Sequence, residues 1–493
     1  MELNELEIPT VKLHIGHREL DSGSGGTFEQ VNPVSNELQA IVPLAGHAEI
    51  HDAVDTAVAA FSAWRETDAE TRRDLLLNLA RLIQENADQF ARMAALDGGI
   101  PTTFGRVHGE WACEWIKYYA GWCDKVDGQL HGTFTSRREL SYSAPEPYGV
   151  VGIINTWNGP LVSLGMKAAP ALAAGNCIIV KPSELVPFAS NLFAKVVKEA
   201  GFPDGVVSVL SGNAEAGEAL VSHPEVELIS FTGGPTAARK ILTNCAEQMK
   251  PSIMELGGKS ANLIFPDADI EAACERATAN VFGILSGQGC ALPTRLLVHT
   301  DVYDEVLERI TNIAASYKVG DPFDPEVVIG PMINAAACDR VMGMLERVRE
   351  LGNGNIVLGG NRCSGELAGQ NFIEATIIAD VDPESEIAQV EVFGPVLVVM
   401  KFHSEEEAVR LANNTKYGLA AHVESNDLKR CHVVADKLKT GSVFINGGQM
   451  IRPHNPFGGL GISGNGKEGG RAGIDEFLRY KAVVIGGESS HAT

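Results

Sequence analysis

The sequence predicts an α/β fold with parallel β-sheets, and two observations carry this prediction. First, from Gly149 onward, short apolar runs alternate with stretches of helical periodicity. Second, runs such as GVVGII and CIIVK lack the polar alternation of a half-exposed strand, which indicates strands buried on both faces. Parallel sheets of this kind bind ligands beyond the carboxyl ends of their strands, so the loops after these runs are the places to search for a site.

The elements follow from the same periodicities. Residues 49–97 predict two amphipathic helices, and Thr67 with Glu70 has the spacing of a capping box at the start of the second. Strands are then expected at 149–154, 177–181, 205–210 and 226–231. Helices between and after them are expected at 160–174, 187–200, 214–222 and 235–245. A second α/β stretch is expected from 258 to about 463, and the tail FLRYKAVVI is expected to form a strand.

Composition narrows the class of protein. A chain of 493 residues is too long for one ordinary core, so two or three domains are expected. The net charge of −23 disfavours nucleic acid and anionic membranes as partners. The longest charge-free stretch, 147–166, is interrupted by Asn, Gly and Pro, which is typical of a buried strand and loop and not of a membrane span.

The cysteine content predicts a reducing compartment. The nine cysteines are odd in number and none forms a CxxC pair, which disfavours both a disulfide framework and a zinc site. The N-terminal segment lacks a basic region followed by an apolar run, so no signal peptide is predicted. These observations favour a cytoplasmic protein that holds no metal.

Two phosphate-binding motifs are present only in part. GNGKEG at 464–469 fits G-x-G-x-x-G, but no predicted strand precedes it. Gly258-Lys259-Ser260 resembles the end of a P-loop, yet Ile253 stands where that motif requires glycine. Neither segment therefore supports a nucleotide triphosphatase.

Three loops carry residues suited to acyl chemistry. Cys290 lies in GQGC, among residues that allow a tight, open backbone on which a sulfur can meet a substrate. Glu255 follows an apolar run and is a candidate general base, and Asn158 follows another run and offers an amide donor for an oxyanion. Each residue alone is also compatible with a structural role, as a buried inert thiol or an ordinary strand-end polar group.

Together with other segments, these loops resemble the aldehyde dehydrogenase superfamily over roughly residues 25–480. The matching segments, in chain order, are TWN at 156–158, KPSE at 181–184, GFPDGVVSVLSG at 201–212, FTGG at 231–234, ELGGKS at 255–260, GQGC at 287–290, EVFGPV at 391–396, NNTKYGLAA at 413–421, and PFGG with SGNGKEGG at 456–470.

The resemblance implies roles for the three candidates. Cys290 matches the nucleophile, Glu255 the base that activates the deacylating water, and Asn158 the oxyanion donor, together with the backbone N–H of Cys290. Lys167 and Glu468 match positions near a proton path. The implied reaction is oxidation of an aldehyde to a carboxylic acid through a thiohemiacetal and a thioester.

The resemblance also implies a binding site for NAD. Glu184 would hold the adenosine ribose with Lys181 and would repel a 2′-phosphate, so NADP is less favoured. Glu391 would hold the nicotinamide ribose, Phe393 would pack at the nicotinamide end, and Gly233 with Gly234 would open a helix N-terminus near the pyrophosphate. The other residues expected to contact the cofactor are Thr156, Trp157, Ser183, Gly212, Phe231, Thr232 and Leu256.

The expected substrate pocket has an apolar wall. By resemblance it is lined by Trp111, Gly159, Val162, Ser163, Met166, Gln449, Ile451 and Phe457, with Trp115, Gly289 and Ala291 at or near it. No lysine or arginine occurs among these positions, although Arg452 is near in sequence. A bulky apolar or aromatic aldehyde is therefore favoured over a semialdehyde acid, with family drift without consequence as the alternative.

The resemblance finally implies a domain organisation. A Rossmann-like NAD-binding domain would comprise 1–126 and 148–257, a catalytic domain 258–463, and a small β oligomerisation segment 127–147 and 473–493, in a homodimer or homotetramer. Two alternatives remain open. A coenzyme A-acylating enzyme is disfavoured by Glu255, and a catalytically idle NAD-binding structural protein is disfavoured because Cys290, Glu255 and Asn158 are all present.

Overall fold

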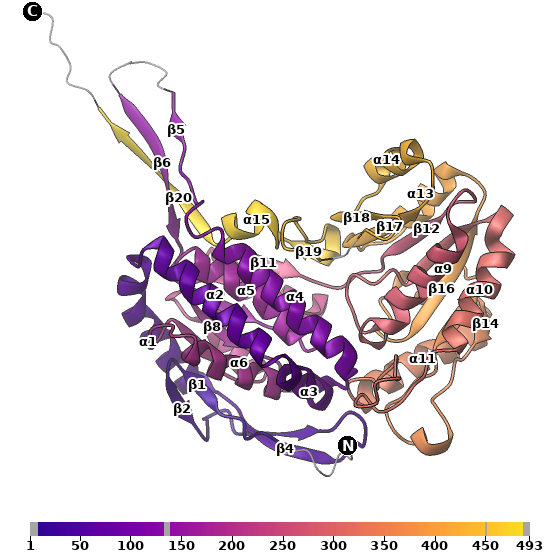
Figure 1. The fold of residues 1–493 in the computed structure, drawn as a ribbon, viewed down its shortest axis with the longest axis horizontal. Helices are drawn as coiled ribbons and strands as arrows, with labels where there is room; N and C mark the ends of the chain where they lie inside the picture. The colour runs from indigo at the N-terminus through magenta and orange to yellow at the C-terminus, as the bar shows by residue number, and fades with distance from the viewer. Residues whose placement is uncertain (1–7, 133–138, 449–450, 487–493) are drawn as a thin grey trace, which may run out of the picture.

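A computed structural model describes residues 8–132, 139–448 and 451–486. Its chain forms two α/β parts side by side, with a third, narrow sheet projecting from the first part (Figure 1). Two large, mostly parallel sheets and a small antiparallel sheet confirm the predicted α/β class.

The first sheet has eight strands in the order β19-β11-β10-β7-β8-β9-β1-β2. Its strands are β1 Leu13–Ile15, β2 Arg18–Leu20, β7 Val150–Ile154, β8 Cys177–Lys181, β9 Val207–Val209, β10 Val226–Thr232, β11 Ser252–Glu255 and β19 Gly464–Asn465. The central strands pair in parallel, whereas β1, β2 and β19 pair antiparallel at the edges. The predicted parallel core is confirmed, and the antiparallel edge strands are additional to it.

The helices predicted between these strands are present within two residues of their expected ends. They are α5 Pro160–Ala173, α6 Pro187–Glu199, α7 Ala214–Ser222 and α8 Pro235–Glu247. Three of them begin with proline, whose missing N–H costs nothing in a first turn. At α6 the buried Asp97 carboxylate accepts hydrogen bonds from the backbone N–H groups of Phe188 and Ala189, at 2.9 and 2.8 Å.

The N-terminal helical region differs from its prediction. Three helices occur, α1 His47–Arg65, α2 Ala69–Glu85 and α3 Ala87–Gly98, where two were expected over 49–97, and a fourth, α4 Thr102–Ala120, follows them. Asn86 both ends α2 and precedes α3, a break without glycine or proline that periodicity cannot reveal. The predicted capping box is also wrong by one residue, because Asp68 caps α2 by accepting from Thr71 N at 2.8 Å.

The second sheet has seven strands in the order β14-β15-β16-β13-β12-β17-β18. They are β12 Ala261–Ile264, β13 Arg295–His299, β14 Asn355–Leu358, β15 Thr376–Ala379, β16 Val396–Phe402, β17 Ala420–Glu424 and β18 Ser442–Ile445. Its helices are α9 Ile270–Thr278, α10 Tyr303–Ala315, α11 Ala335–Leu351, α12 Glu386–Gln389, α13 Glu405–Asn413 and α14 Leu428–Lys437. Apolar clusters fill both faces of this sheet, as expected for buried parallel strands.

The remaining strands form two small antiparallel sheets. β20 Leu478–Ile485, β6 Leu140–Pro147 and β5 Leu130–His131 make the narrow projecting sheet, and the strand predicted from FLRYKAVVI is thereby confirmed. β3 Thr27–Val31 pairs with β4 Leu38–Pro43, and α15 Gly470–Asp475 precedes β20. Among the described residues, no helix has the length and hydropathy to cross a bilayer.

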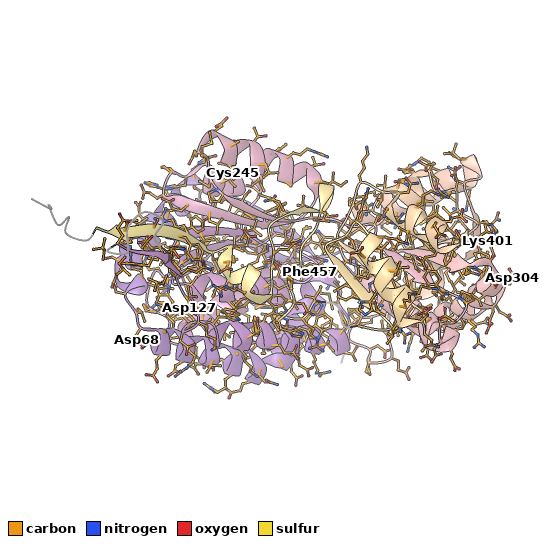
Figure 2. All side chains as sticks on the ribbon, turned by 90° about the horizontal axis from the view of Figure 1, so that it is seen from above. Asp68, Asp127, Cys245, Asp304, Lys401 and Phe457 are labelled. Carbon is orange, nitrogen blue, oxygen red and sulfur yellow. The ribbon has the colours of Figure 1, made fainter. Side chains whose placement is uncertain are left out.

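Seen from above, Phe457 lies between the part of the molecule that holds Cys245 and the part that holds Lys401 (Figure 2). The chain crosses between the two large sheets after β11, and it returns to the first sheet at β19. The junction therefore gathers the ends of strands from both sheets, and the candidate site lies there.

Candidate active site

Asn158 is held beside the loop that carries the candidate nucleophile. It follows β7, where Thr156 Oγ1 donates to its Oδ1 at 2.7 Å and its Nδ2 donates to the carbonyl of Gln288 at 2.7 Å. These two bonds fix which side of the amide carries the donor. One N–H is used on the 288–290 segment, and the second remains for a ligand.

Cys290 ends a segment with a tight backbone. Leu285 and Ser286 have positive φ values of 54°, and Gly287 has φ 78° in a position where a Cβ would lie 2.1 Å from the carbonyl oxygen of Gly394. Glycine is therefore required at 287, as the sequence predicted for a tight turn. The half-buried Cys290 lines a cavity together with Asn158 and Glu255.

The surroundings of Cys290 favour the thiol over the thiolate. Burial first, and then the nearby carboxylates Glu391 and Glu255, raise the pKa of Cys290 to about 12. A reaction that needs the thiolate must therefore supply a proton acceptor or a compensating positive charge.

Glu255 is a buried carboxyl at the end of β11. It is 4% exposed, and neither carboxylate oxygen has a hydrogen-bond partner in the part of the chain that the structure describes. Burial, followed by the charge of Glu468, raises its pKa well above the ordinary value. Gly458 stands against it, since a Cβ there would lie 2.6 Å from Oε1. A perturbed, unpartnered carboxyl in a cavity is typical of a functional group.

Lys167 and Glu468 form a buried pair near this carboxyl. Lys167 Nζ lies 2.5 Å from Glu468 Oε1 and 3.0 Å from Ser230 Oγ, and both charged side chains are almost fully buried. Glu468 is tied to the junction by its two backbone hydrogen bonds with Phe457. The structure thus brings the two residues together, and their charges act on the pKa of Glu255.

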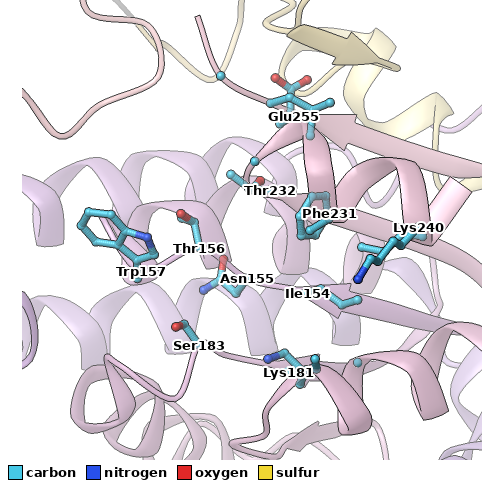
Figure 3. Close-up of a pocket in the computed structure, with 18 of the residues that line it drawn as sticks. Ile154, Asn155, Thr156, Trp157, Lys181, Ser183, Phe231, Thr232, Lys240 and Glu255 are labelled. Atoms are coloured by element: carbon cyan, nitrogen blue, oxygen red, sulfur yellow. The ribbon is translucent and has the colours of Figure 1, made fainter. Parts of the chain in front are cut away.

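The cavity has a volume of about 790 Å³ and extends from Cys290 along the carboxyl ends of β7, β8 and β10 to a slot between α7 and α8. Figure 3 shows part of its lining, with Ile154, Lys181 and Phe231 labelled. All the expected cofactor residues except Gly212 line it: Thr156, Trp157, Lys181, Ser183, Glu184, Phe231, Thr232, Gly233, Gly234, Leu256, Glu391 and Phe393. Gly212 lies behind the wall, where its carbonyl accepts a hydrogen bond from Lys181 Nζ at 2.5 Å.

Two carboxylates, Glu184 and Glu391, line the cavity at different points. Glu184 Oε2 lies 3.9 Å from Lys181 Nζ, and its side chain is partly exposed. Glu391 Oε1 accepts from Gly258 N at 2.9 Å, and burial raises the pKa of Glu391 to about 7. A Cβ at residue 257 would lie 2.3 Å from Glu391 Oε2, which accounts for glycine there.

The start of α8 completes the fit for a dinucleotide. Gly234 caps the helix, and a Cβ added at this residue would meet no atom within 4 Å, so the approach to the helix N-terminus is open. The free N–H groups there suit phosphate, and the two spaced carboxylates suit ribose hydroxyls. Phe393 has φ 52° and packs edge-on against Trp157 at 5.3 Å between ring centroids.

The expected substrate wall lies on α4, α5 and the 451–457 segment. Trp111, Val162, Ser163, Met166, Ile451 and Phe457 all belong to or pack against one apolar cluster with Cys290, apart from the polar Ser163, which is 7% exposed. Trp115 is fully buried behind this wall, and Gln449 lies outside the described residues.

The sequence reasoning missed one residue of this wall. A Cβ at Gly159 would lie 3.6 Å from His108 Cε1, so the space beside Gly159 is bounded by an imidazole. His108 packs edge-on against Phe104 and at a tilt against Trp111 on α4, and burial lowers its pKa to about 4. The i, i+4, i+7 spacing of these three aromatic rings was the available signal.

Arg452 is not a free cation. Its Nη1 pairs with Glu114 Oε2 on α4. Arg452, which follows Ile451 in the sequence, is thus paired with a carboxylate of the same chain.

Comparison with known proteins agrees with this geometry. A family model described as the aldehyde dehydrogenase family matches residues 20–483. A putative aldehyde dehydrogenase-like protein of Schizosaccharomyces pombe is 40% identical over 94% of this chain and 92% of its own, and an aldehyde dehydrogenase of Emericella nidulans is 36% identical over 97% of each. The solved NAD⁺ complex of an aldehyde dehydrogenase from Bacillus cereus superposes with a TM-score of 0.93 at 36% identity, covering 97% of both chains. The chain is therefore a member of the aldehyde dehydrogenase family, an NAD(P)-dependent enzyme that oxidises aldehydes.

Proposed function

We propose that this enzyme oxidises a bulky apolar or aromatic aldehyde to its carboxylic acid with NAD, through a covalent intermediate on Cys290. The observation that carries the proposal is the convergence of three groups on one cavity. Cys290, Glu255 and Asn158 all line it, and the Asn158 amide is bonded to the carbonyl two residues before the thiol.

The first step is attack of Cys290 Sγ on the aldehyde carbon. The free N–H of Asn158 and the backbone N–H of Cys290 stabilise the negative charge that grows on oxygen, an effect of about 3–4 kcal/mol per donor. The bound cofactor supplies a cationic nicotinamide ring that accepts hydride. Because burial and carboxylates hold the pKa of Cys290 at about 12, positive charge beside the thiol favours the thiolate.

The second step is hydrolysis of the Cys290 thioester. Glu255 removes a proton from the attacking water, a contribution of about 10²–10⁴-fold for a general base. Its raised pKa makes it a strong base once ionised, and the buried pair of Lys167 and Glu468 offers the next stations for the proton. Transfer of the acyl group to coenzyme A does not need a carboxylate that activates water, so the presence of Glu255 also disfavours that alternative.

The cofactor preference is proposed from Glu184. Its partly exposed carboxylate lies where the adenosine ribose is expected, so it accepts hydrogen bonds from the ribose hydroxyls and repels a 2′-phosphate. We therefore infer that NAD is favoured over NADP.

The substrate class is proposed from the apolar wall and from Arg452. The residues of the wall are aromatic and aliphatic, and Arg452, which follows Ile451 in the sequence, is already paired with Glu114. A carboxylate-bearing aldehyde would lose hydration without gaining a cation. The test is kcat/KM, followed by absorbance of NADH at 340 nm, for benzaldehyde, a long branched aldehyde, acetaldehyde and succinic semialdehyde. A best rate with succinic semialdehyde would contradict the proposal, and NADH formation that depends on coenzyme A, with an acyl-CoA thioester as the product, would favour the acylating alternative.

The proposed assembly is a homodimer or homotetramer of cytoplasmic subunits. The expected oligomerisation segments, 127–147 and 473–493, contain the three strands of the projecting sheet. Exposed apolar side chains gather on it: Leu130, Leu140, Val484 and Ile485. Apolar exposure of this kind is typical of a surface covered in an assembly. The domain division proposed with this assembly is an NAD-binding part, 1–126 with 148–257, and a catalytic part, 258–463; β19 Gly464–Asn465 lies outside both ranges and pairs with β11 of the first sheet.

A further inference from the structure

The slot between α7 and α8 is lined by one face of each helix. From α7 the lining residues are Ala214, Gly217, Glu218 and Val221, and from α8 they are Ala237, Lys240, Ile241, Thr243 and Asn244. Most of these side chains are small or apolar, which leaves a narrow space suited to a flat ring. Lys240 is the exception on α8, since it brings a positive charge to the wall.

Lys240 differs from the other cations that line the cavity. Lys181 donates to the carbonyl of Gly212, and Arg340 donates to the carbonyl of Val392. Lys240 is exposed and has no hydrogen-bond or ion-pair partner among the residues that the structure describes. An unpaired ammonium group in a cavity is available to an anionic group of a ligand.

The direction of the Lys240 side chain is set by the helix. A helical side chain leans toward the N-terminus of its helix, and α8 begins at Pro235. In Figure 3 the ammonium group of Lys240 points away from α8, toward the side of the cavity on which Lys181 lies. Lys181 in turn lies 3.9 Å from Glu184, where the adenosine ribose is proposed to bind.

We propose that Lys240 is a specificity-determining residue that attracts the 2′-phosphate of NADP and so limits the preference for NAD that Glu184 creates. The inference rests on the proposed place of the adenosine ribose at Glu184. Glu218 on the opposite wall and Glu184 repel such a phosphate, and Lys181 and Lys240 attract it. Lys181 is engaged with a carbonyl, so Lys240 is the group free to move toward the phosphate.

The pyrophosphate is a less suitable partner for Lys240. It is common to both cofactors and is proposed to lie at the N-terminus of α8, where backbone N–H groups receive it. Lys240 is six residues beyond Gly234, roughly 9 Å along the helix axis. No helix N-terminus is proposed to lie at the 2′-phosphate, so a cationic side chain is needed to bind it.

The experiment is calorimetric titration of 5′-AMP and 2′,5′-ADP, with no aldehyde present, into wild type, Lys240→Met and Arg239→Met. Methionine keeps the unbranched side chain and removes the charge. Arg239 is the matched control because it is exposed on the same helix, carries the same charge and does not line the cavity. We expect Lys240→Met to raise the Kd for 2′,5′-ADP about fivefold, as for one exposed ion pair. The Kd for 5′-AMP should change less than about twofold, and the difference should shrink at high salt.

Several results would overturn the proposal. An equal loss for both ligands would assign Lys240 to the base or the 5′-phosphate. An equal loss of affinity in Arg239→Met would show that the effect comes from long-range charge and not from Lys240 itself. If 2′,5′-ADP did not bind measurably to wild type, the proposed 2′-phosphate ligand would be ruled out. Failure of wild type to bind 5′-AMP would show that the proposed ribose site is wrong. Because no aldehyde is present in the titration, that outcome is distinct from any failure of the catalytic proposal.

Discussion

The cofactor side and the substrate side of the site are built differently. Much of the cofactor cavity is lined by residues that end or follow strands of the first sheet, with glycines at 233 and 257 where a Cβ would strike a neighbouring atom. The substrate wall is made of side chains on α4, α5 and a C-terminal segment. Strand ends and required glycines fix the first region, whereas the second depends on which side chains two packed helices present. Substitutions in the first region should therefore damage catalysis, whereas substitutions in the second should mainly change which substrate is preferred.

The largest expected effect is at the nucleophile. Cys290→Ala should lower kcat for every aldehyde by at least about 10³-fold, because no thiohemiacetal can form. The Kd for NAD, measured by quenching of protein fluorescence, should stay within about twofold, since a thiol contributes little to binding. Turnover near the wild-type rate would remove Cys290 from the mechanism.

Glu255→Gln should separate the two chemical steps. One equivalent of NADH should form rapidly, and steady-state turnover should then fall by about 10²–10⁴-fold. Intact-mass spectrometry should show the acylated chain. If the variant turns over without impairment, another base serves.

The pH dependence follows from the same carboxyl. Burial raises the pKa of Glu255, so its active, ionised form grows as the pH rises and is lost as the pH falls. The steady-state rate in wild type should thus increase as the pH rises through the pKa of Glu255 and level off above it, and a stopped-flow burst should report acylation separately. A deacylation rate that does not change with pH over the range in which the protein stays folded would contradict the assignment.

A smaller and selective effect is expected on the substrate wall. Gly159→Phe should place a ring beside Cys290, because His108 already bounds the space behind residue 159. The kcat/KM for benzaldehyde should fall at least about tenfold, while that for acetaldehyde should change less than threefold. Gly159→Ala serves as the control and should change neither value much. Equal losses for both aldehydes would indicate a damaged site and not a smaller pocket.

The smallest effect concerns the cofactor. Wild type should prefer NAD over NADP by about tenfold or more in kcat/KM, which corresponds to about 1.4 kcal/mol. Glu184→Gln should reduce this preference, because an amide does not repel the 2′-phosphate. Comparable kcat/KM values for the two cofactors in wild type would refute the role given to Glu184.

The same contrast explains what the sequence could and could not predict. The strands from Val150 to Thr232 and the helices between them were predicted because their apolar runs have clear lengths and periods. Glu184 and Glu391 were predicted to contact the cofactor because they stand in recognisable loops. Both residues line the cavity. A motif therefore predicts the role of a residue only where that role requires a particular local backbone conformation.

Features that depend on packing between helices were missed. His108 belongs to the wall only because α4 meets α5 at Gly159, and Lys240 belongs to the cavity only because α7 faces α8. The break at Asn86 likewise has no local signal of glycine or proline. A lysine or histidine on one face of an amphipathic helix looks like a solvated or core residue until its neighbours are known.

The unpartnered carboxyl of Glu255 also has a consequence for stability. Because its pKa is raised in the folded chain, folding favours the protonated form, and that contribution to the free energy of unfolding is lost as the pH rises through the folded pKa. The ionised form is the one proposed to deacylate the enzyme. On that proposal, activity and stability move in opposite directions as the pH rises through the folded pKa, where the enzyme should gain rate while its half-life at elevated temperature shortens.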